Sequence, residues 1–395
     1  MGKSGVLQKV EGRMESTLIT CLADNILSPL GATSGDNFAA VSEGRSMLRR
    51  HEGVFGLPEP FCASLFDRDE IRAIARTAVG GYESYTFFET LCILSAMKAL
   101  ESCSVDPAAD DVLFIFSTTK GNVDCLSSSL DDRRCYLADS ALRVARYFGN
   151  AVTPLVVSNA CVSGVCAQIA AVRSLLAGRC RHAVVIGCDV LSGFIVSGFQ
   201  SFKALSPEPC RPYDRDRVGL NLGEAAATMV LSAADSMSDD KWYYAASSNH
   251  NDANHISGPS RTGEGACRVL SDILKSLRRD EIAFVNAHGT ATAYNDEMES
   301  IALHRAGLDD TPVNGLKGFY GHTLGAAGVA ETILSMKAID NGVVLPTKGY
   351  SEQGTTYALS ISPDVRTASR RSFIKILSGF GGSNAGIAYR KGGDA

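Results

Sequence analysis

The sequence lacks the features that mark several common protein classes. It has no run of about 18 apolar residues, the minimum for a helix that spans a membrane, and residues 1–15 have no apolar core of the kind found in a secretory signal. It has no cluster of Lys and Arg, and its formal net charge of −5 is of the sign that phosphate groups repel. We therefore expect a cytoplasmic protein with no membrane span and no nucleic acid partner, and we expect residues 1–15 to be a leader outside the fold.

Cysteine pairs at short spacing are also lacking. The chain has 12 cysteines, but it has no Cys-x-x-Cys pair and no cluster of Cys with His. This spacing argues against a zinc site and against a disulfide framework. It indicates free thiols in a reducing compartment.

Apolar residues, in contrast, are plentiful: they make up 45% of the 395 residues. β-rich segments such as DVLFIFSTT and HAVVIGCDV alternate with helical segments such as YESYTFFETLCILSAMKALES. Alternation of this kind predicts an α/β fold in which helices cover a buried sheet.

Three segments of the first half recur, in the same order, in the second half. The paired segments are 110–121 with 281–292, 156–179 with 312–342, and 182–190 plus 219–232 with 373–390. The shared pattern is a strand, a turn of small residues and a long helix, followed by two further strands. It predicts two duplicated halves, residues 16–240 and 241–395, that meet in a polar segment near 235–245.

Cys161 lies in a turn of small residues between a β-rich segment and a helical one, within VSNACVSGVCAQIAAVRSLL. The first N–H groups of a helix lack partners and carry partial positive charge. A thiol at this place is expected to ionise more easily, and the free N–H groups can bind an oxyanion. A buried cysteine is most often structural, so this interpretation depends on the motifs that accompany it.

Three such motifs follow. In FVNAHGTATAYNDEMES, a β-rich segment ends at His288. In LKGFYGHTLGAAGVAETI, His322 precedes a helix of Gly and Ala, residues that allow close packing, and Lys317 lies five positions earlier. The glycine-rich turn SGFGGSNAGIAY separates two β-rich segments.

The four motifs, in this order and together with FKALSP and CRPYDRDRVGLNLGEAA, resemble the β-ketoacyl synthase family over roughly residues 16–390. The resemblance implies the thiolase-like fold, in which two duplicated α/β halves form a five-layered αβαβα core. It implies that Cys161 accepts the acyl group and that His288 and His322 polarise the malonyl thioester. Lys317 and Glu299 are then expected to order the two imidazoles.

The resemblance implies further roles around this centre. The backbone N–H groups of Cys161 and Phe380 would form the oxyanion hole, and the Phe380 side chain would act as a gate. Lys203 would contact an acidic carrier protein. The expected substrate-binding residues are Thr290, Thr292, Phe199, Phe380 and Asn384.

The implied reaction is a decarboxylative condensation of a Cys161-bound acyl group with a malonyl thioester, which needs no metal and no other cofactor. An acyl carrier protein would act in trans, because the resemblance uses the whole chain. The segments 82–103 and 154–158 are expected to contribute to a homodimer, or to a heterodimer with a related subunit. The pathway stays open between fatty acid, polyene and polyketide synthesis.

The sequence departs from the family pattern at four places. Asn159 stands where a small hydroxyl residue is usual, Val162 where Ser or Thr is frequent, and Ala293 where the HGT motif usually ends in proline. Lys120, in STTKGN, is unusual beside an alkyl tunnel; we favour a surface-pointing side chain over one that contacts an uncommon acyl chain or partner.

Three other functions compete with the synthase. A thiolase-type enzyme would need a second reactive cysteine near the glycine turn, but the last cysteine is Cys267. A non-catalytic, chain-length-controlling subunit would lack the nucleophile, whereas Cys161, His288 and His322 are all present. A cysteine hydrolase would lack the paired GH and GFGG motifs.

Overall fold

The structure of the chain is a computed structural model that describes residues 17–127 and 132–393. The expected leader, residues 1–15, lies outside the described residues. Within the described part, no helix is long and apolar enough to cross a membrane.

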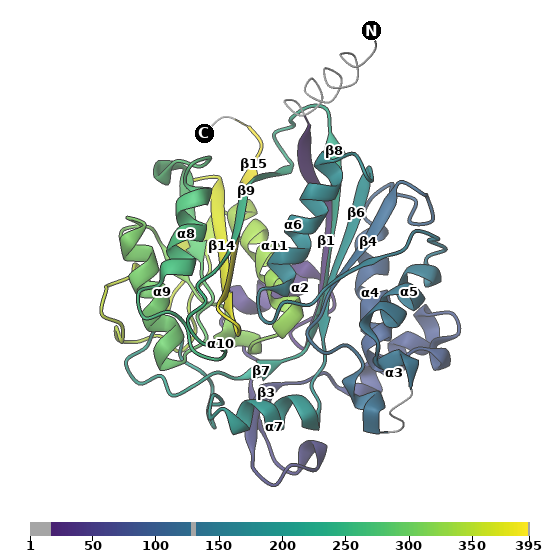
Figure 1. Ribbon diagram of the computed structural model, residues 1–395, viewed down its shortest axis with the longest axis horizontal. Coiled ribbons are helices and arrows are strands. Elements are labelled where there is room, and N and C mark those ends of the chain that lie inside the picture. Colours follow the sequence, from purple (N-terminus) through teal and green to yellow (C-terminus); the bar gives the residue numbers. More distant parts are fainter. Residues whose placement is uncertain (1–16, 128–131, 394–395) are drawn as a thin grey trace.

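Two sets of five strands form one ten-stranded mixed sheet, whose order is β11-β10-β14-β15-β9-β1-β8-β6-β4-β5 (Figure 1). The first set is β1 (Leu18–Leu27), β4 (Val112–Ser117), β5 (Leu155–Val157), β6 (His182–Asp189) and β8 (Ala225–Ala234). The second set is β9 (Trp242–Asn251), β10 (Ile282–Asn286), β11 (Val313–Asn314), β14 (Ser372–Gly379) and β15 (Ser383–Lys391).

The two sets have the same topology. Outward from the short β1–β9 pairing at the centre, each set places its first, fifth, fourth, second and third strand in that order. This repeated order confirms the duplicated α/β architecture expected from the sequence repeats. The exact boundary near residue 240 stays a prediction.

Helices complete five layers around the two half-sheets. The central layer is α6 (Ser163–Leu176) and α11 (Ala327–Asp340), each of which contacts strands of both sets. One outer layer is α4 (Phe87–Leu100) with α5 (Leu137–Tyr147), and the other is α8 (Glu264–Ile273) with α9 (Ala293–Arg305). Figure 1 shows α6 and α11 between the two outer pairs. Because helices cover both faces of each half-sheet, a strand such as β4 is buried along its whole length and is apolar from Val112 to Phe116.

Shorter elements fill the rest of the described chain. The remaining helices are α2 (Ser34–Ser42), α3 (Arg68–Ala78), α7 (Gly193–Ser201) and α10 (Lys317–Tyr320). The remaining strands are β2 (Arg49–His51), β3 (Phe61–Ser64), β7 (Leu222–Gly223), β12 (Val343–Val344) and β13 (Arg366–Thr367).

The two central helices meet at glycines. A Cβ atom on Gly164 would lie 2.8 Å from the Cα atom of Gly328, closer than real Cβ contacts allow. The absence of side chains at these two positions therefore lets α6 and α11 approach closely, as expected from the small residues of the sequence. The contact also brings together the segments that precede the two helices, which carry Cys161 and His322.

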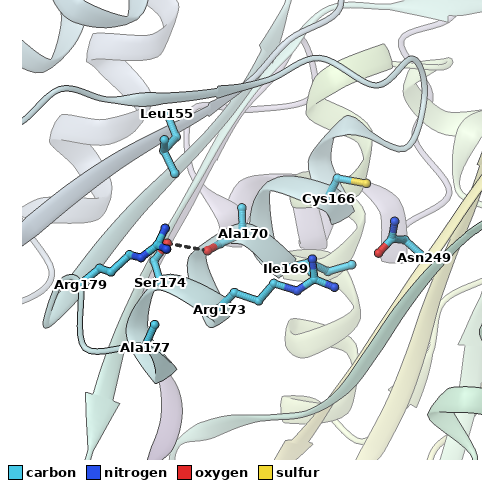
Figure 2. Close-up of a pocket in the computed structure, with 9 residues that line it drawn as sticks. All are labelled: Leu155, Cys166, Ile169, Ala170, Arg173, Ser174, Ala177, Arg179 and Asn249. Carbon is cyan, nitrogen blue, oxygen red and sulfur yellow. Dashed lines mark hydrogen bonds between the residues drawn. The ribbon is translucent and has the colours of Figure 1, made fainter.

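One edge of the sheet is open. β5 pairs with β4 on one side, and no strand in the described residues pairs with its other side. Leu155 on this edge is 41% exposed. A groove of about 480 Å³ runs beside it along α6, between Leu155, Ile169 and the side chains of Arg173 and Arg179 (Figure 2).

Candidate active site

Cys161 lies in a tight turn between β5 and α6. Ala160 has a φ of +44°, in the left-handed region, and this reverses the chain directly before the cysteine. Two hydrogen bonds hold the turn: the Asn159 N–H donates to Ser163 Oγ at 2.8 Å, and that hydroxyl donates to the Ala160 carbonyl at 2.6 Å. The turn fixes the thiol at the start of α6.

The fold brings Cys161 together with His288 and His322. The Cys161 Sγ atom and one ring nitrogen of each histidine all lie within 4.8 Å of one another. The two imidazole rings are nearly perpendicular, with centroids 5.0 Å apart. All three side chains are buried, with exposed fractions of 8%, 3% and 1%. Cys161 precedes α6 of the first half, whereas His288 follows β10 and His322 precedes α11 in the second half, so the two halves of the fold meet at this point.

The hydrogen-bond partner of His322 determines its tautomer. The Leu324 N–H donates to Nδ1 of His322 at 3.2 Å. The neutral ring must then carry its proton on Nε2, and this atom is buried with no hydrogen-bond partner in the described structure. His288 Nδ1 is also buried without a partner. Unsatisfied buried polar atoms of this kind are costly and need a functional explanation.

Burial sets the charge states of the three groups. It lowers the pKa of both His288 and His322 well below the usual value, and the positive charge of Lys317 lowers them further. Burial also raises the pKa of Cys161 to about 11, although Lys317 and the backbone N–H groups of Phe380 and Cys161 act in the opposite direction. The expectation of an easily ionised thiol was therefore wrong for the free protein, because desolvation outweighs the helix terminus.

The same three side chains are close enough to contact one metal ion. A set of one Cys and two His is chemically able to bind zinc. The buried ammonium of Lys317, however, acts on both imidazoles and on the thiol, and it would repel a divalent cation. This argument is consistent with the expected absence of a metal, which stays a prediction.

Two buried lysines share one carboxylate beneath His288. Lys317 Nζ donates to the His288 carbonyl at 2.6 Å and to Glu331 Oε1 at 2.9 Å. Lys375 Nζ donates to the Ala287 carbonyl at 3.1 Å and to Glu331 Oε2. Sequence reasoning had found Lys317 but missed Glu331 and Lys375. The signal was present, because both charges interrupt apolar segments, VAETILSM and RSFIKILSG.

Glu299 supports the same strand end from α9. Its carboxylate accepts the N–H groups of His288 at 2.6 Å and Gly289 at 2.8 Å, and the hydroxyl of Tyr213 at 2.9 Å. The structure thus places Glu299 behind the His288 backbone, in contact with its peptide group and not with its ring.

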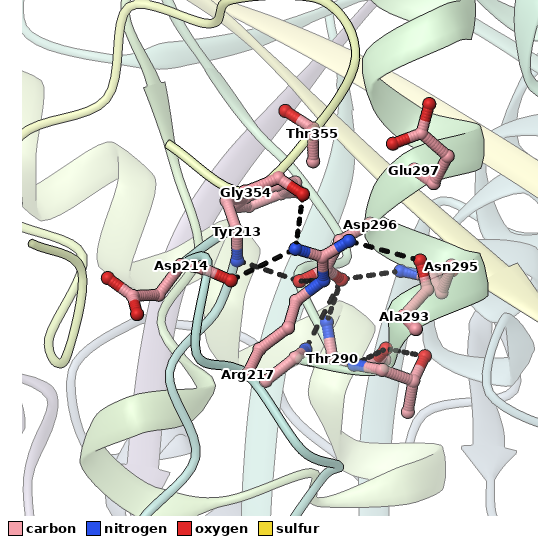
Figure 3. Close-up of polar contacts among 12 residues, drawn as sticks. Tyr213, Asp214, Arg217, Thr290, Ala293, Asn295, Asp296, Glu297, Gly354 and Thr355 are labelled. Atoms are coloured by element: carbon pink, nitrogen blue, oxygen red, sulfur yellow. Dashed lines mark hydrogen bonds and ion pairs between the residues drawn. The ribbon is translucent and has the colours of Figure 1, made fainter. Parts of the chain in front are cut away.

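A second carboxylate on α9, Asp296, braces the loop that carries Thr290 and Thr292 (Figure 3). It accepts the N–H groups of Thr290 at 3.0 Å and Tyr213 at 2.7 Å, and Arg217 lies 3.9 Å away. Burial, together with the nearby charge of Glu299, raises the pKa of Asp296 to about 7. The hydroxyl groups of Thr290 and Thr292 lie 2.9 Å apart and are held by this loop.

A pocket of about 310 Å³ opens onto the three side chains. Among the residues expected to bind substrate or carrier, those that line it are Thr290, Thr292, Phe199, Phe380 and Lys203. The Phe380 ring packs between Phe199, at a centroid distance of 5.9 Å, and Phe202, at 5.4 Å. These three rings form one wall next to the thiol.

Asn384 is placed differently. It is buried and does not line the pocket. Its side chain accepts a hydrogen bond from Ser378 Oγ at 2.7 Å and donates to the Gly382 carbonyl at 3.0 Å. The structure therefore shows Asn384 stabilising the glycine-rich turn internally.

The structure also shows the surroundings of two of the four residues that depart from the family pattern. Lys120 is exposed, in agreement with the surface interpretation, yet its charge is close enough to lower the pKa of Cys161. Asn159 Oδ1 accepts a hydrogen bond from Ser383 Oγ at 3.1 Å. Asn159 thereby ties the turn of Cys161 to the glycine-rich turn that carries Phe380.

Comparisons with known families place both halves of the chain. Residues 88–236 match the family model of the beta-ketoacyl synthase N-terminal domain, and residues 243–351 match that of the C-terminal domain.

Two bacterial proteins are similar to this chain over more than half of its length. The chain is 34% identical to nodulation protein E of Rhizobium leguminosarum bv. trifolii over 245 residues, which is 60% of this chain and 61% of that protein's length. It is 30% identical over 336 residues to the tetracenomycin polyketide synthase ketoacyl synthase alpha subunit of Streptomyces glaucescens, covering 74% of this chain and 78% of that protein.

Solved structures share the fold. A ketosynthase (ApeO) in complex with its chain length factor (ApeC) from Xenorhabdus doucetiae has a TM-score of 0.84 and 23% identity, covering 95% of this chain and 98% of that one. A beta-ketoacyl synthase from Burkholderia phymatum STM815 has a TM-score of 0.82 and 22% identity, covering 95% and 100%. The likeness confirms the thiolase-like ketosynthase fold.

The raised pKa of Cys161 predicts its reactivity in the absence of substrate. Below that pKa, the thiolate fraction rises tenfold with each pH unit. The initial rate of alkylation by iodoacetamide at Cys161 should therefore increase about tenfold per unit from pH 7 to pH 10. Peptide mass spectrometry that resolves Cys161 from Cys166 measures this rate. A rate that levels off below pH 9 would contradict the prediction.

Proposed function

Since the chain belongs to the β-ketoacyl synthase family, we propose that it catalyses the decarboxylative condensation of a Cys161-bound acyl group with a malonyl group on an acyl carrier protein. The observation that carries this proposal is the gathering of Cys161, His288 and His322 within 4.8 Å of one another at the floor of a pocket. In this proposal residues 16–240 supply the nucleophile, and residues 241–395 supply the two imidazoles.

The first step is acyl transfer. The Cys161 sulfur attacks the thioester carbonyl, the bond to the carrier sulfur breaks, and the thiol proton of Cys161 passes on balance to the departing thiolate. The N–H groups of Cys161 and Phe380, which already act on this sulfur, would stabilise the oxyanion of the tetrahedral intermediate. A thiol that is neutral at rest is shielded from side reactions until the acyl donor is bound.

The second step removes CO2 from the malonyl thioester. The carbon–carboxylate bond breaks, and its electron pair forms an enolate whose charge develops on the thioester oxygen. The unpartnered Nε2–H of His322 is a ready donor to this oxygen, and His288 lies beside it. Neutral donors in a dry site stabilise charge where it develops and need no reorganisation.

The third step forms the carbon–carbon bond. The enolate carbon attacks the acyl carbonyl on Cys161, the carbon–sulfur bond breaks, and the cysteine thiolate recovers a proton from solvent. The product is a β-ketoacyl group on the carrier. Apart from this solvent proton, every group that the scheme needs belongs to the protein or to the two thioesters.

The residues at the mouth of the pocket favour a carrier protein as the source of the thioester. Lys203, Phe202 and Tyr294 line it, and both aromatic side chains are exposed. A basic side chain among exposed aromatic rings suits an acidic, partly apolar partner. Thr290 and Thr292, farther inside, can donate hydrogen bonds to the amides of a pantetheine arm.

We also propose assembly through the open edge at β5, where Leu155 and the groove of Figure 2 are exposed. An unpaired edge strand is a template for pairing with another chain. One solved structural neighbour is a ketosynthase in complex with its chain length factor, so a related subunit is the alternative to a second copy. The pathway stays open between fatty acid, polyene and polyketide synthesis, because one relative is named for polyketide synthesis and another only as a putative mitochondrial 3-oxoacyl-[acyl-carrier-protein] synthase.

Acylation of the thiol tests the first step. Incubation with a panel of acyl carrier thioesters should add one acyl group to the intact protein, because the sulfur retains the acyl chain until condensation. Intact-protein mass spectrometry should show this adduct on the wild type and on Cys267→Ala, but not on Cys161→Ala. No adduct with any donor would reject the catalytic proposal and favour a non-catalytic subunit.

Removal of one imidazole tests the second step. His322→Ala should lower the rate of CO2 release from a malonyl carrier thioester about 10²- to 10³-fold, the usual cost of losing one oxyanion donor. Formation of the acyl adduct on Cys161 should fall much less. If both rates fall by the same factor, His322 shapes the site and does not act as the donor.

The edge-strand proposal predicts the mass in solution. Light scattering should give the wild type the mass of two chains, whereas Leu155→Asp should give that of one chain, because a charge would then be buried at the contact. Val365→Asp is the matched control, since Val365 is 40% exposed on another surface. A monomeric wild type would exclude pairing of two copies and leave the related subunit as the partner.

A further inference from the structure

Lys375 is an unexpected residue at its position in the fold. It lies in the middle of β14, a strand whose side chains from Ser372 to Leu377 are all buried, and it is itself completely inaccessible. Lysine is almost never fully buried unless it is paired. The three steps of the proposed reaction do not use it.

The contacts of Lys375 lead directly to His288. Its ammonium group donates to the carbonyl of Ala287, and Lys317 donates to the carbonyl of His288, the next residue. The same two ammonium groups bind the two oxygens of Glu331. Two cations therefore hold two consecutive peptide groups at the strand end that carries His288, and one carboxylate holds both cations.

Lys317 and Lys375 bring two positive charges to this cluster, and Glu331 on α11 brings one negative charge, because the lysines hold the pKa of its carboxyl below the usual value. Glu299 on α9 also faces the cluster; burial raises the pKa of its carboxyl, and the N–H groups of His288 and Gly289 act in the opposite direction.

Two phenols that interact with Glu331 are neutral. Tyr213 and Tyr320 are buried phenols with raised pKa values. Burial lowers the pKa of Lys375 itself to about 8, so its ammonium is still charged at neutral pH. Its charge is among those that lower the pKa of both His288 and His322.

We propose that Lys375 is a positioning residue of the condensation site: it fixes the His288 backbone together with Lys317, and it supplies a second buried positive charge that keeps both imidazoles neutral. A neutral imidazole keeps one N–H group, which can donate a hydrogen bond to the enolate oxygen. This inference rests on the proposed function for its catalytic consequence, but the charge state of the rings can be measured independently of activity.

A pair of variants separates charge from packing. Lys375→Met removes one positive charge, whereas Lys375→Met combined with Glu331→Gln removes one charge of each sign and restores the original net charge. The acidic limb is the fall of the malonyl decarboxylation rate as the pH is lowered. In the single variant, this limb should move up by about one pH unit, because the imidazoles gain protons more easily. In the double variant, the limb should return toward its wild-type position.

A lysine on α11 that lies away from the site provides the control. Lys337→Met on α11 removes a lysine that pairs with Asp24 away from the site, and it should leave the limb unchanged. If Lys375 only filled space, the double variant would be at least as impaired as the single one, with no return of the limb. That result, or an unshifted limb in Lys375→Met, would overturn the proposal.

A measurement on the wild type covers the case in which Lys375→Met does not fold. Nuclear magnetic resonance of ¹⁵N-labelled histidines, assigned with His288→Gln and His322→Gln, follows each ring as the pH is lowered. His288 and His322 should stay neutral well below pH 6.5, the ordinary pKa of a histidine side chain. Protonation of either ring near pH 6.5 would overturn the inference.

The two proposals can fail separately. A wild type that decarboxylates no malonyl carrier thioester would reject the proposed function, and the histidine titration would still decide whether the cluster keeps the rings neutral.

Discussion

The close contact of α6 with α11 at Gly164 and Gly328 is the constraint on which the site depends. Cys161 precedes one helix and His322 precedes the other, so the separation of the two helices sets the separation of thiol and imidazole. The duplicated topology makes this possible, because equivalent strand–helix connections from the two halves point their helices into one shared layer. A side chain at either glycine would separate the helices, and the cost would fall on the geometry of catalysis as well as on packing.

The contact places ionisable groups in the driest part of the molecule, and this determines their chemistry. An imidazole or thiol removed from water favours its neutral form. Burial therefore favours two neutral imidazoles and a neutral thiol at this site. The lysines beneath His288 stay charged in the same environment because Glu331 is shared between them. A buried ion pair is seldom a source of net stability, so a function in fixing the strand end explains better why this cluster is present.

Much of this arrangement was predictable from local sequence. The alternation of strands and helices gave the fold class, and the small residues around Cys161, His288, His322 and Lys317 pointed to the residues that the fold gathers. Local sequence could not give properties that arise from the whole fold. The pairing of Glu331 with Lys375 joins α11 to β14 across 44 residues. The ionisation of Cys161 was mispredicted because its burial depends on both halves, and the placement of Asn384 depends on how the glycine turn closes on itself.

The wall of aromatic rings links this rigid centre to substrate entry. Phe380 belongs to the glycine-rich turn, and its N–H acts on the Cys161 sulfur while its ring packs against Phe199 and Phe202. Any movement of this turn would therefore change the N–H group beside the Cys161 sulfur and the pocket wall at the same time. Asn159 restrains that movement, because its side chain connects the nucleophile turn to Ser383. The unusual asparagine thus connects the turn of Cys161 to the turn that carries the Phe380 side of the pocket wall.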